Sequence, residues 1–268
     1  MDDTKTMTSN VSEGTEIRPD VYYHTTGIVN VVMIGDPRGD DWVLMDTGVP
    51  NSADSLMEIV SERFPRNNRP SAIILTHGHF DHVGGIQELI EEWKTPVYAH
   101  PDEFVYLTGQ QTYPKPNVIR GRKLMIRMST LYADKRINIG EVLMPLPPDG
   151  TLPGLPGWTW IHTPGHSPGH VSFFRESDRV LLAGDAFVTV RTDSFYKVIF
   201  QKAEINGPPP FFTTDWEIAY DSVKKLAALK PDIAVTGHGP AMEGEELRIG
   251  LEELVNEFNE IAVPKYVK

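Results

Sequence analysis

Hydrophobic and polar positions follow two different periods along the chain. Short apolar runs rich in β-branched residues predict strands over 28–34, 42–45, 72–75, 96–99, 158–162, 171–174, 179–183 and 233–235. Apolar residues with helical spacing predict helices over 84–93, from about Ser52 to Arg63, from Thr214 or Asp215 to near Leu229, and from Glu245 to Glu260. Two pairs of these strands flank the turn sequences DPRGDD and RESD, which predicts two hairpins. Because strands alternate with helices and also form hairpins, the predicted fold class is a mixed α/β (α+β) sandwich.

Two segments break this rhythm. Residues 1–18 are polar and non-periodic, so we expect a disordered tail that cannot bury enough apolar area to fold. Residues 101–150 lose the strand–helix alternation and contain several prolines. We therefore expect one domain over 19–268, in which 101–150 is a lid-like insertion. Within it, 118–132 mixes apolar and basic side chains and is either a lid over a site or an ordinary surface helix.

Composition and charge restrict the partners. No stretch approaches the ~18 apolar residues of a membrane span, and the first ten residues lack the basic flank and apolar core of a secretory signal. We expect a cytoplasmic protein without a membrane partner. The formal net charge of -12 repels phosphate backbones, so nucleic acid is not an expected partner. The chain has no cysteine, so imidazole and carboxylate groups must hold any bound metal.

Four side chains of the metal-ligand type follow the predicted strand 72–75. They are His77, His79, Asp81 and His82. Side chains alternate in an extended segment, so His77 and His79 should point to one side, and the turn into the next helix should redirect the other two. One short loop could therefore serve two metal ions.

Three further candidates stand in later loops, each after a predicted strand and beside Gly or Pro. They are His166 in TPGHSPGH, Asp185 in AGDA and His238 in TGHGP. A set of nitrogen and oxygen donors suits Zn²⁺, Mn²⁺, Fe or Co²⁺ better than Ca²⁺ or Mg²⁺, which prefer oxygen alone. We expect two divalent metal ions, with Zn²⁺ first among these.

The ordered set His-x-His-x-Asp-His, TPGHSPGH, GD and GHG resembles the metallo-β-lactamase-fold hydrolase superfamily over about residues 20–240. The resemblance implies an αββα sandwich with metals at one edge of the two sheets. It implies that Asp185 bridges a first and a second metal, the first held by His77, His79 and His166 and the second by Asp81, His82 and His238. It further implies that a metal-bridging hydroxide attacks the substrate.

The same resemblance implies roles beyond metal binding. Asp81 would be catalytic and take a proton as the reaction intermediate breaks down, and Asp46 would orient a metal ligand from outside the site. His162 and His170 lie four residues before and after His166 and are expected to be structural. The superfamily hosts many reactions, so the fold leaves the substrate open.

Absences and local composition favour one reaction. The missing cysteine argues against the common metal-dependent β-lactamases, and the short acidic segment after His238 argues against a glutathione substrate. We expect a hydrolase that cleaves an ester or lactone of a small, fairly apolar substrate. Its pocket would be walled by Phe195, Tyr196, Phe200, Phe211 and Phe212. A glyoxalase II-like thioester hydrolase and a mononuclear iron persulfide dioxygenase are the alternatives, and a homodimer stays open.

Overall fold

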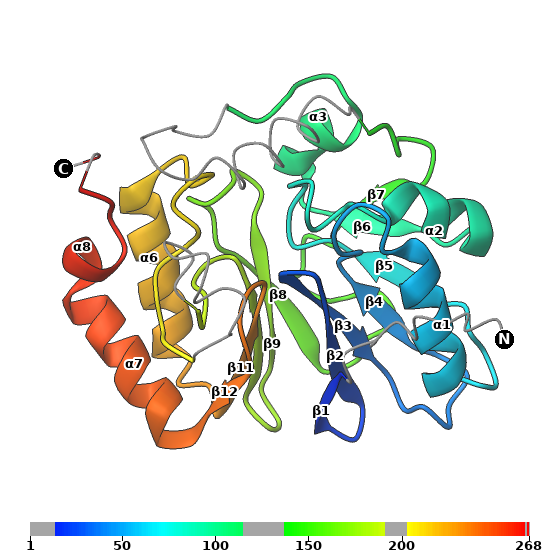
Figure 1. Cartoon of the computed structure of the whole chain (residues 1–268), viewed down its shortest axis with the longest axis horizontal. Coiled ribbons are helices and arrows are strands. Elements are labelled where there is room, and N and C mark those ends of the chain that lie inside the picture. The colour runs from blue at the N-terminus through cyan, green and yellow to red at the C-terminus, as the bar shows by residue number, and fades with distance from the viewer. Residues whose placement is uncertain (1–13, 115–136, 191–202, 266, 268) are drawn as a thin grey trace, which may run out of the picture.

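Two β-sheets pack face to face, and helices cover both outer faces (Figure 1). The computed structural model describes residues 14–114, 137–190, 203–265 and 267. The strands are β1 (Thr15–Arg18), β2 (Val21–Thr26), β3 (Val29–Ile34), β4 (Val43–Met45), β5 (Ala72–Ile74), β6 (Val97–Ala99), β7 (Leu143–Pro145), β8 (Trp158–His162), β9 (Val171–Arg175), β10 (Val180–Gly184), β11 (Ile233–Thr236) and β12 (Met242–Glu243). This arrangement confirms the predicted αββα sandwich.

The helices fill the connections between strands. They are α1 (Ala53–Arg63), α2 (Ile86–Trp93), the 3-10 turn η1 (Pro101–Glu103), α3 (Phe104–Leu107), α6 (Trp216–Ala228), α7 (Gly244–Asn256) and α8 (Phe258–Ile261). As predicted, Asp215 caps α6, since its carboxylate accepts hydrogen bonds from the backbone N–H groups of Glu217 and Ile218. None of the helices in the described ranges is long and apolar enough to cross a membrane.

The two sheets differ in topology. The first runs in chain order from β1 to β7, with antiparallel pairing up to β4 and parallel pairing from β4 to β7. The second has the order β12-β11-β10-β9-β8 and contains one parallel pair, β10 with β11. Parallel neighbours need a crossover connection, and helices lie in three of these: α1 between β4 and β5, α2 between β5 and β6, and α6 between β10 and β11.

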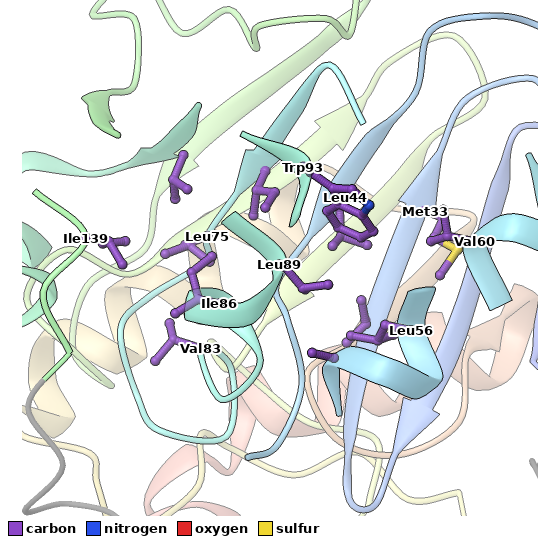
Figure 2. Packing of buried hydrophobic residues seen from close by; sticks show 14 of the residues in the cluster. Met33, Leu44, Leu56, Val60, Leu75, Val83, Ile86, Leu89, Trp93 and Ile139 are labelled. Carbon is purple, nitrogen blue, oxygen red and sulfur yellow. The ribbon is translucent and has the colours of Figure 1, made fainter. Parts of the chain in front are cut away.

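Alternating side chains divide the core into three layers. In β3, Val31 and Met33 face the helices α1 and α2, whereas Val32 and Ile34 face the second sheet. The apolar faces of α1 and α2 pack on this outer side through residues such as Leu56 and Leu89 (Figure 2). In the second sheet, β10 alternates in the same way between the central layer and the layer under α6 and α7.

The carboxyl ends of β4, β5, β8, β10 and β11 meet at one edge of the sandwich, because these strands run in the same direction. Hydrogen bonds join the two sheets there. The backbone N–H of Val171 donates to the Thr76 carbonyl at 3.0 Å, and the buried Asn30 amide donates to the Thr236 carbonyl at 2.8 Å. The loops that follow these strands are therefore held close together.

Two of the predicted element boundaries are wrong. The expected tail over 1–18 ends too late, because Thr15–Arg18 forms β1 and pairs with β2. The expected helix over 245–260 is two helices, since Glu257 leaves the helical conformation (φ -122°, ψ 30°). This break directs Phe258 into the core, where its ring lies 5.0 Å from that of Tyr220.

The expected lid-like insertion over 101–150 is wrong at both described ends. Leu107 and Ile139 are buried in the core beside α2, and β7 extends the first sheet by pairing with β6. The prolines of this segment argued against a strand in the sequence. The strand β7 nevertheless accommodates Pro145 because it lies at the edge of the sheet, where a missing backbone N–H is tolerated. The proposed lid over 118–132 lies outside the described residues.

Candidate metal centre

The loop after β5 carries the first set of ligand-type side chains. The backbone N–H groups of His82 and Val83 both donate to the His79 carbonyl, which closes a turn just before α2. This turn redirects Asp81 and His82, as the sequence predicts. The rings of His77 and His79 lie 4.5 Å apart and nearly perpendicular.

Three loops of the second sheet bring the remaining candidates. Gly165 (φ 122°) precedes His166, and Gly184 (φ 55°) precedes Asp185. Both glycines adopt left-handed backbone that other residues rarely take, and this lets each loop turn sharply at the strand end. The strand β11 ends at Thr236, and His238 lies two residues further along the chain.

The structure brings all seven predicted site residues into one cluster. Every one of these side chains is buried, the most exposed being His238 at 6 %. Within each of three overlapping groups, the candidate ligand atoms lie within 4.8 Å of one another: His77, His79 and His166; His77, His82 and Asp185; Asp81, His82 and His238. The first and third groups are the two ligand sets that the resemblance implied.

Asp185 lies between these two groups. Its Oδ2 is 3.4 Å from Nε2 of His166, on one side. On the other side it is 3.5 Å from Nε2 of His82 and 3.3 Å from Nε2 of His238. His79 and His166 also approach closely, with 2.9 Å between Nδ1 and Nε2. One carboxylate therefore contacts imidazoles of both groups.

Partners outside the cluster orient four of the five imidazoles through Nδ1. They are the Thr76 hydroxyl for His77 (3.0 Å), Asp46 for His82 (2.8 Å), the Thr213 hydroxyl for His166 (3.2 Å) and the Ile28 carbonyl for His238 (2.7 Å). A carboxylate and a carbonyl only accept, so Nδ1 of His82 and of His238 must donate. In the neutral rings, Nε2 then presents the lone pair that a metal requires.

The electrostatics differ between the two groups. Burial lowers the pKa of His77 and of His79 well below the usual value, and neighbouring imidazoles lower both further. Burial also lowers the pKa of His166 to about 4. Burial acts in the same direction on His82 and His238, but the charges and hydrogen bonds of nearby carboxylates together outweigh it and raise the pKa of both: Asp185 with Asp46 at His82, and Asp185 with Asp81 at His238. The carboxylates thus favour a positive charge beside His82 and His238, and a bound metal cation would supply such a charge.

The buried atoms of the cluster fit a metal. Within the described part of the chain, Nε2 of His77, Nε2 of His82 and Oδ1 of Asp185 are buried without a hydrogen-bond partner. A buried polar atom without a partner costs free energy, so native proteins rarely leave several together. Nitrogen and carboxylate oxygen are donors that Zn²⁺, Mn²⁺ and Fe accept. The residues present are therefore suited to hold divalent metal.

Sequence reasoning missed one buried acid near the cluster, Glu103. Its carboxylate accepts hydrogen bonds from the backbone N–H groups of Gly78 and Gly169, which belong to two ligand-bearing loops. It follows the predicted strand 96–99 in the sequence HPDE, and an acid after a strand was the one available signal. Its partners are distant in sequence, so the signal alone would not have revealed the role.

Of the two histidines expected to be structural, His170 lies beside the cluster, with its ring 5.2 Å from that of His77. Both nitrogens of His170 are engaged, Nε2 by the Asp185 backbone N–H at 2.8 Å and Nδ1 by the Thr163 carbonyl at 3.1 Å. His162 stacks on His100 with ring centroids 4.1 Å apart and planes at 11°. Asp102 lies near this pair, but the in-plane lone pairs of parallel rings cannot converge on one ion.

Comparisons with known proteins agree with this geometry. A family model described as the metallo-beta-lactamase superfamily matches residues 24–238. The chain is 43% identical over 249 residues to the "Probable metallo-hydrolase YflN" of Bacillus subtilis, covering 92% of this chain and 94% of that protein.

More distant relatives share the same architecture. Hydroxyacylglutathione hydrolase GloC of Haemophilus influenzae is 29% identical over 69% of this chain and 74% of its own length. The crystal structure of TTHA1623 in a di-iron-bound form superposes with a TM-score of 0.58 at 27% identity, covering 86% of this chain and 94% of that one. The sequence match, the sandwich fold and the clustered ligands agree: this chain belongs to the metallo-β-lactamase superfamily.

Proposed function

We propose that this chain is a metal-dependent hydrolase with a dinuclear site that cleaves an ester or lactone of a small, fairly apolar substrate. The observation that carries the proposal is the position of Asp185. Its Oδ2 lies 3.3 to 3.5 Å from imidazole nitrogens of both ligand groups, and its Oδ1 is buried without a partner in the described residues. A carboxylate shared in this way is suited to bridge two cations.

The proposed ligands divide as the overlapping groups do. His77, His79 and His166 would hold one ion, Asp81, His82 and His238 the other, and Asp185 both. Two divalent ions bound there, Zn²⁺ or alternatively Mn²⁺, Fe or Co²⁺, would activate a water at neutral pH and polarise the scissile carbonyl.

Asp81 is the proposed catalytic carboxylate. Its Oδ2 lies 3.6 Å from Nε2 of His238, and the side chain is 7 % exposed. At this place it can accept a proton from the attacking water and return it to the leaving oxygen. His82 and His238 stay correctly oriented during this transfer because Asp46 and the Ile28 carbonyl hold their Nδ1 atoms.

Aromatic rings beside the cluster support an apolar substrate. The ring of Tyr113 lies 4.4 Å from that of His79, and the ring of Phe212 lies 5.0 Å from it. Phe80 extends this wall, with its ring 6.1 Å from Phe212. Of the aromatic residues predicted from the sequence, Phe195, Tyr196 and Phe200 lie outside the described residues. An acyl or aryl arm packed on this wall would gain ~0.8 kcal/mol for each buried CH₂.

A thioester hydrolase is the second candidate function. GloC, a relative at 29% identity, is a hydroxyacylglutathione hydrolase by name. The residues after His238 argue against a glutathione substrate in this chain, because the acidic helix α7 offers little attraction to the anionic tripeptide. A small-molecule substrate is common to both candidates.

Metal analysis and a substrate series test the proposal together. We expect two divalent ions per chain, and a kcat/KM for acyl esters or lactones that rises about fourfold for each of the first added CH₂ groups. Phe212→Leu should flatten that series while the ion count stays at two. A single iron would favour the persulfide dioxygenase chemistry, and a flat series with S-lactoylglutathione as best substrate would favour the thioester hydrolase.

A further inference from the structure

Glu103 lies at the end of η1 with a side chain that is fully buried. Its Oε1 accepts hydrogen bonds from the Ser167 hydroxyl and the Gly169 backbone N–H, both at 2.8 Å. Its Oε2 accepts from the Gly78 backbone N–H at 2.9 Å and from the Tyr113 hydroxyl. Both oxygens of the carboxylate thus accept two hydrogens each, which uses its whole accepting capacity.

Three of these four donors come from two loops that carry candidate metal ligands. Gly78 lies between His77 and His79, whereas Ser167 and Gly169 follow His166. The loops are far apart in sequence, yet Nδ1 of His79 and Nε2 of His166 must stay close, at 2.9 Å in this structure. Glu103 joins the two backbones next to this contact.

Two glycines show how closely the loops approach Glu103 and Tyr113. A Cβ atom on Gly169 would lie 2.7 Å from Cγ of Glu103, and one on Gly78 would lie 2.7 Å from the Tyr113 hydroxyl. Real Cβ contacts do not reach such distances, so a larger residue at either position would force the loop or its neighbour to shift. The sequence of each loop is therefore matched to the buried carboxylate.

The hydrogen-bond pattern suits an ionised carboxylate. Burial raises the pKa of Glu103, while the hydrogen bonds from Tyr113, Ser167 and the two backbone N–H groups act in the opposite direction. The backbone N–H groups of Gly78 and Gly169 can only donate, and one of them meets each oxygen, whereas the Ser167 and Tyr113 hydroxyls can donate or accept. Glutamine is therefore a poor substitute, because its NH₂ group would face a backbone N–H donor on whichever side it lies.

Tyr113 extends the effect to the proposed pocket. Its hydroxyl donates to Glu103, and its ring packs 4.4 Å from His79. Tyr106 stacks on the outer side of Tyr113, with centroids 3.9 Å apart. The carboxylate thus fixes one ring that contacts a candidate ligand, as well as two ligand-bearing backbones.

We propose that Glu103 is a positioning residue for the metal held by His77, His79 and His166: it ties the two loops together so that their imidazoles converge on one ion. The inference rests on the proposed function, since it requires that these imidazoles hold a metal. Glu103 itself contacts neither the ion nor the substrate. It acts through the backbone of Gly78 and Gly169 and through the ring of Tyr113.

The test compares Glu103→Gln with Glu141→Gln, a matched change at an exposed position. Zn²⁺ affinity is measured for each of the two ions by competition with a chromophoric chelator, and Co²⁺ absorption spectra report the ligand geometry. We expect Glu103→Gln to lower the affinity for one ion about 10–100-fold and to alter the Co²⁺ spectrum of that site. The affinity for the other ion should change much less. Glu141→Gln should match the parent protein.

Melting temperatures of the metal-free proteins separate positioning from a structural role. A merely structural Glu103 would lower the melting temperature while chelator affinity and the Co²⁺ spectrum stay unchanged, and that result would overturn the inference. Should Glu103→Gln not fold, Ser167→Ala and Tyr113→Phe each remove one donor and keep the carboxylate. Each should weaken the same ion by about two- to tenfold, and no change in either variant would overturn the inference. A parent protein that binds no metal would instead contradict the proposed function.

Discussion

Each sheet of the sandwich places one buried aspartate where a strand ends at the same edge: Asp46 after β4 and Asp185 after β10. Both corners use left-handed backbone, at Asp46 itself (φ 60°) and at Gly184 (φ 55°). Both approach His82, Asp46 at Nδ1 and Asp185 at Nε2, but their other partners differ. Asp46 accepts hydrogen bonds from the Thr76 backbone N–H and hydroxyl and holds His82, whereas Oδ1 of Asp185 has no partner among the described residues.

This difference shows that partners, and not position in the fold, decide what a buried carboxylate does. Both oxygens of Asp46 already accept hydrogen bonds from protein groups, so this carboxylate can act on a metal only through His82. Asp185 keeps an oxygen free and directs the other at three imidazoles, which leaves it able to bind a cation. The first sheet thus contributes an orienting aspartate and the second a candidate ligand.

The largest expected effect comes from Asp185→Asn. Loss of the buried charge between His82, His166 and His238 should weaken metal binding by roughly 10²–10³-fold, because breaking a buried charge pair is strongly unfavourable. Hydrolysis should fall at least as far, with near-normal circular dichroism. The measurement is metal content after dialysis together with kcat/KM. Retention of both ions at parental affinity would remove Asp185 from the bridging position.

Asp46→Asn should have a smaller effect of a different kind. The NH₂ group of asparagine would donate to Nδ1 of His82 and so place the ring hydrogen on Nε2, where a metal would bind. We expect about 10–100-fold weaker binding of one ion, with both ions retained at saturating metal. Asp149→Asn, at an exposed turn, is the matched control. A loss as large as that of Asp185→Asn would mean that the two aspartates are equivalent after all.

The pH dependence should separate the two ligand groups. Carboxylates raise the pKa of His82 and His238, so in the metal-free protein these rings bind protons more readily than a free imidazole does, and a metal must displace those protons. Burial lowers the pKa of His77 and His79, which are neutral near pH 6 and release none. As the pH falls from about 8 to 6, the metal affinity of the group that contains His82 and His238 should fall about tenfold per pH unit for each proton that the metal displaces. The metal affinity of the group that contains His77 and His79 should stay level. Calorimetric Zn²⁺ titration in buffers of different ionisation enthalpy counts these protons, and equal release at both sites would contradict the prediction.

Local sequence was sufficient wherever one short segment carries the information. The loop from His77 to His82 needs only a strand, a turn and the spacing of its own side chains, and the structure arranges it as predicted. The later ligands His166, Asp185 and His238 each stand alone in a loop. Their grouping came from the ordered resemblance, because no local pattern tells which distant loops will meet.

Sequence reasoning failed where a role depends on partners far along the chain. Glu103 resembles any other acid after a strand until Gly78, Ser167 and Gly169 pack around it. The strand Thr15–Arg18 looks like part of a polar tail until β2 offers its edge. The contributions of Leu107 and Ile139 to the core were hidden in a proline-containing segment for the same reason.

The sequence by itself determined the mixed sandwich and the set of side chains able to bind metal, because residue periods and ligand types are properties of short segments. Only the tertiary structure decided which aspartate is satisfied by the protein and which keeps a free oxygen, and which buried acid joins the ligand loops. The physical reason is that a buried polar atom is satisfied by whatever lies against it once the two sheets have packed. At this edge of the sandwich, most of those neighbours come from the opposite sheet or from a distant loop.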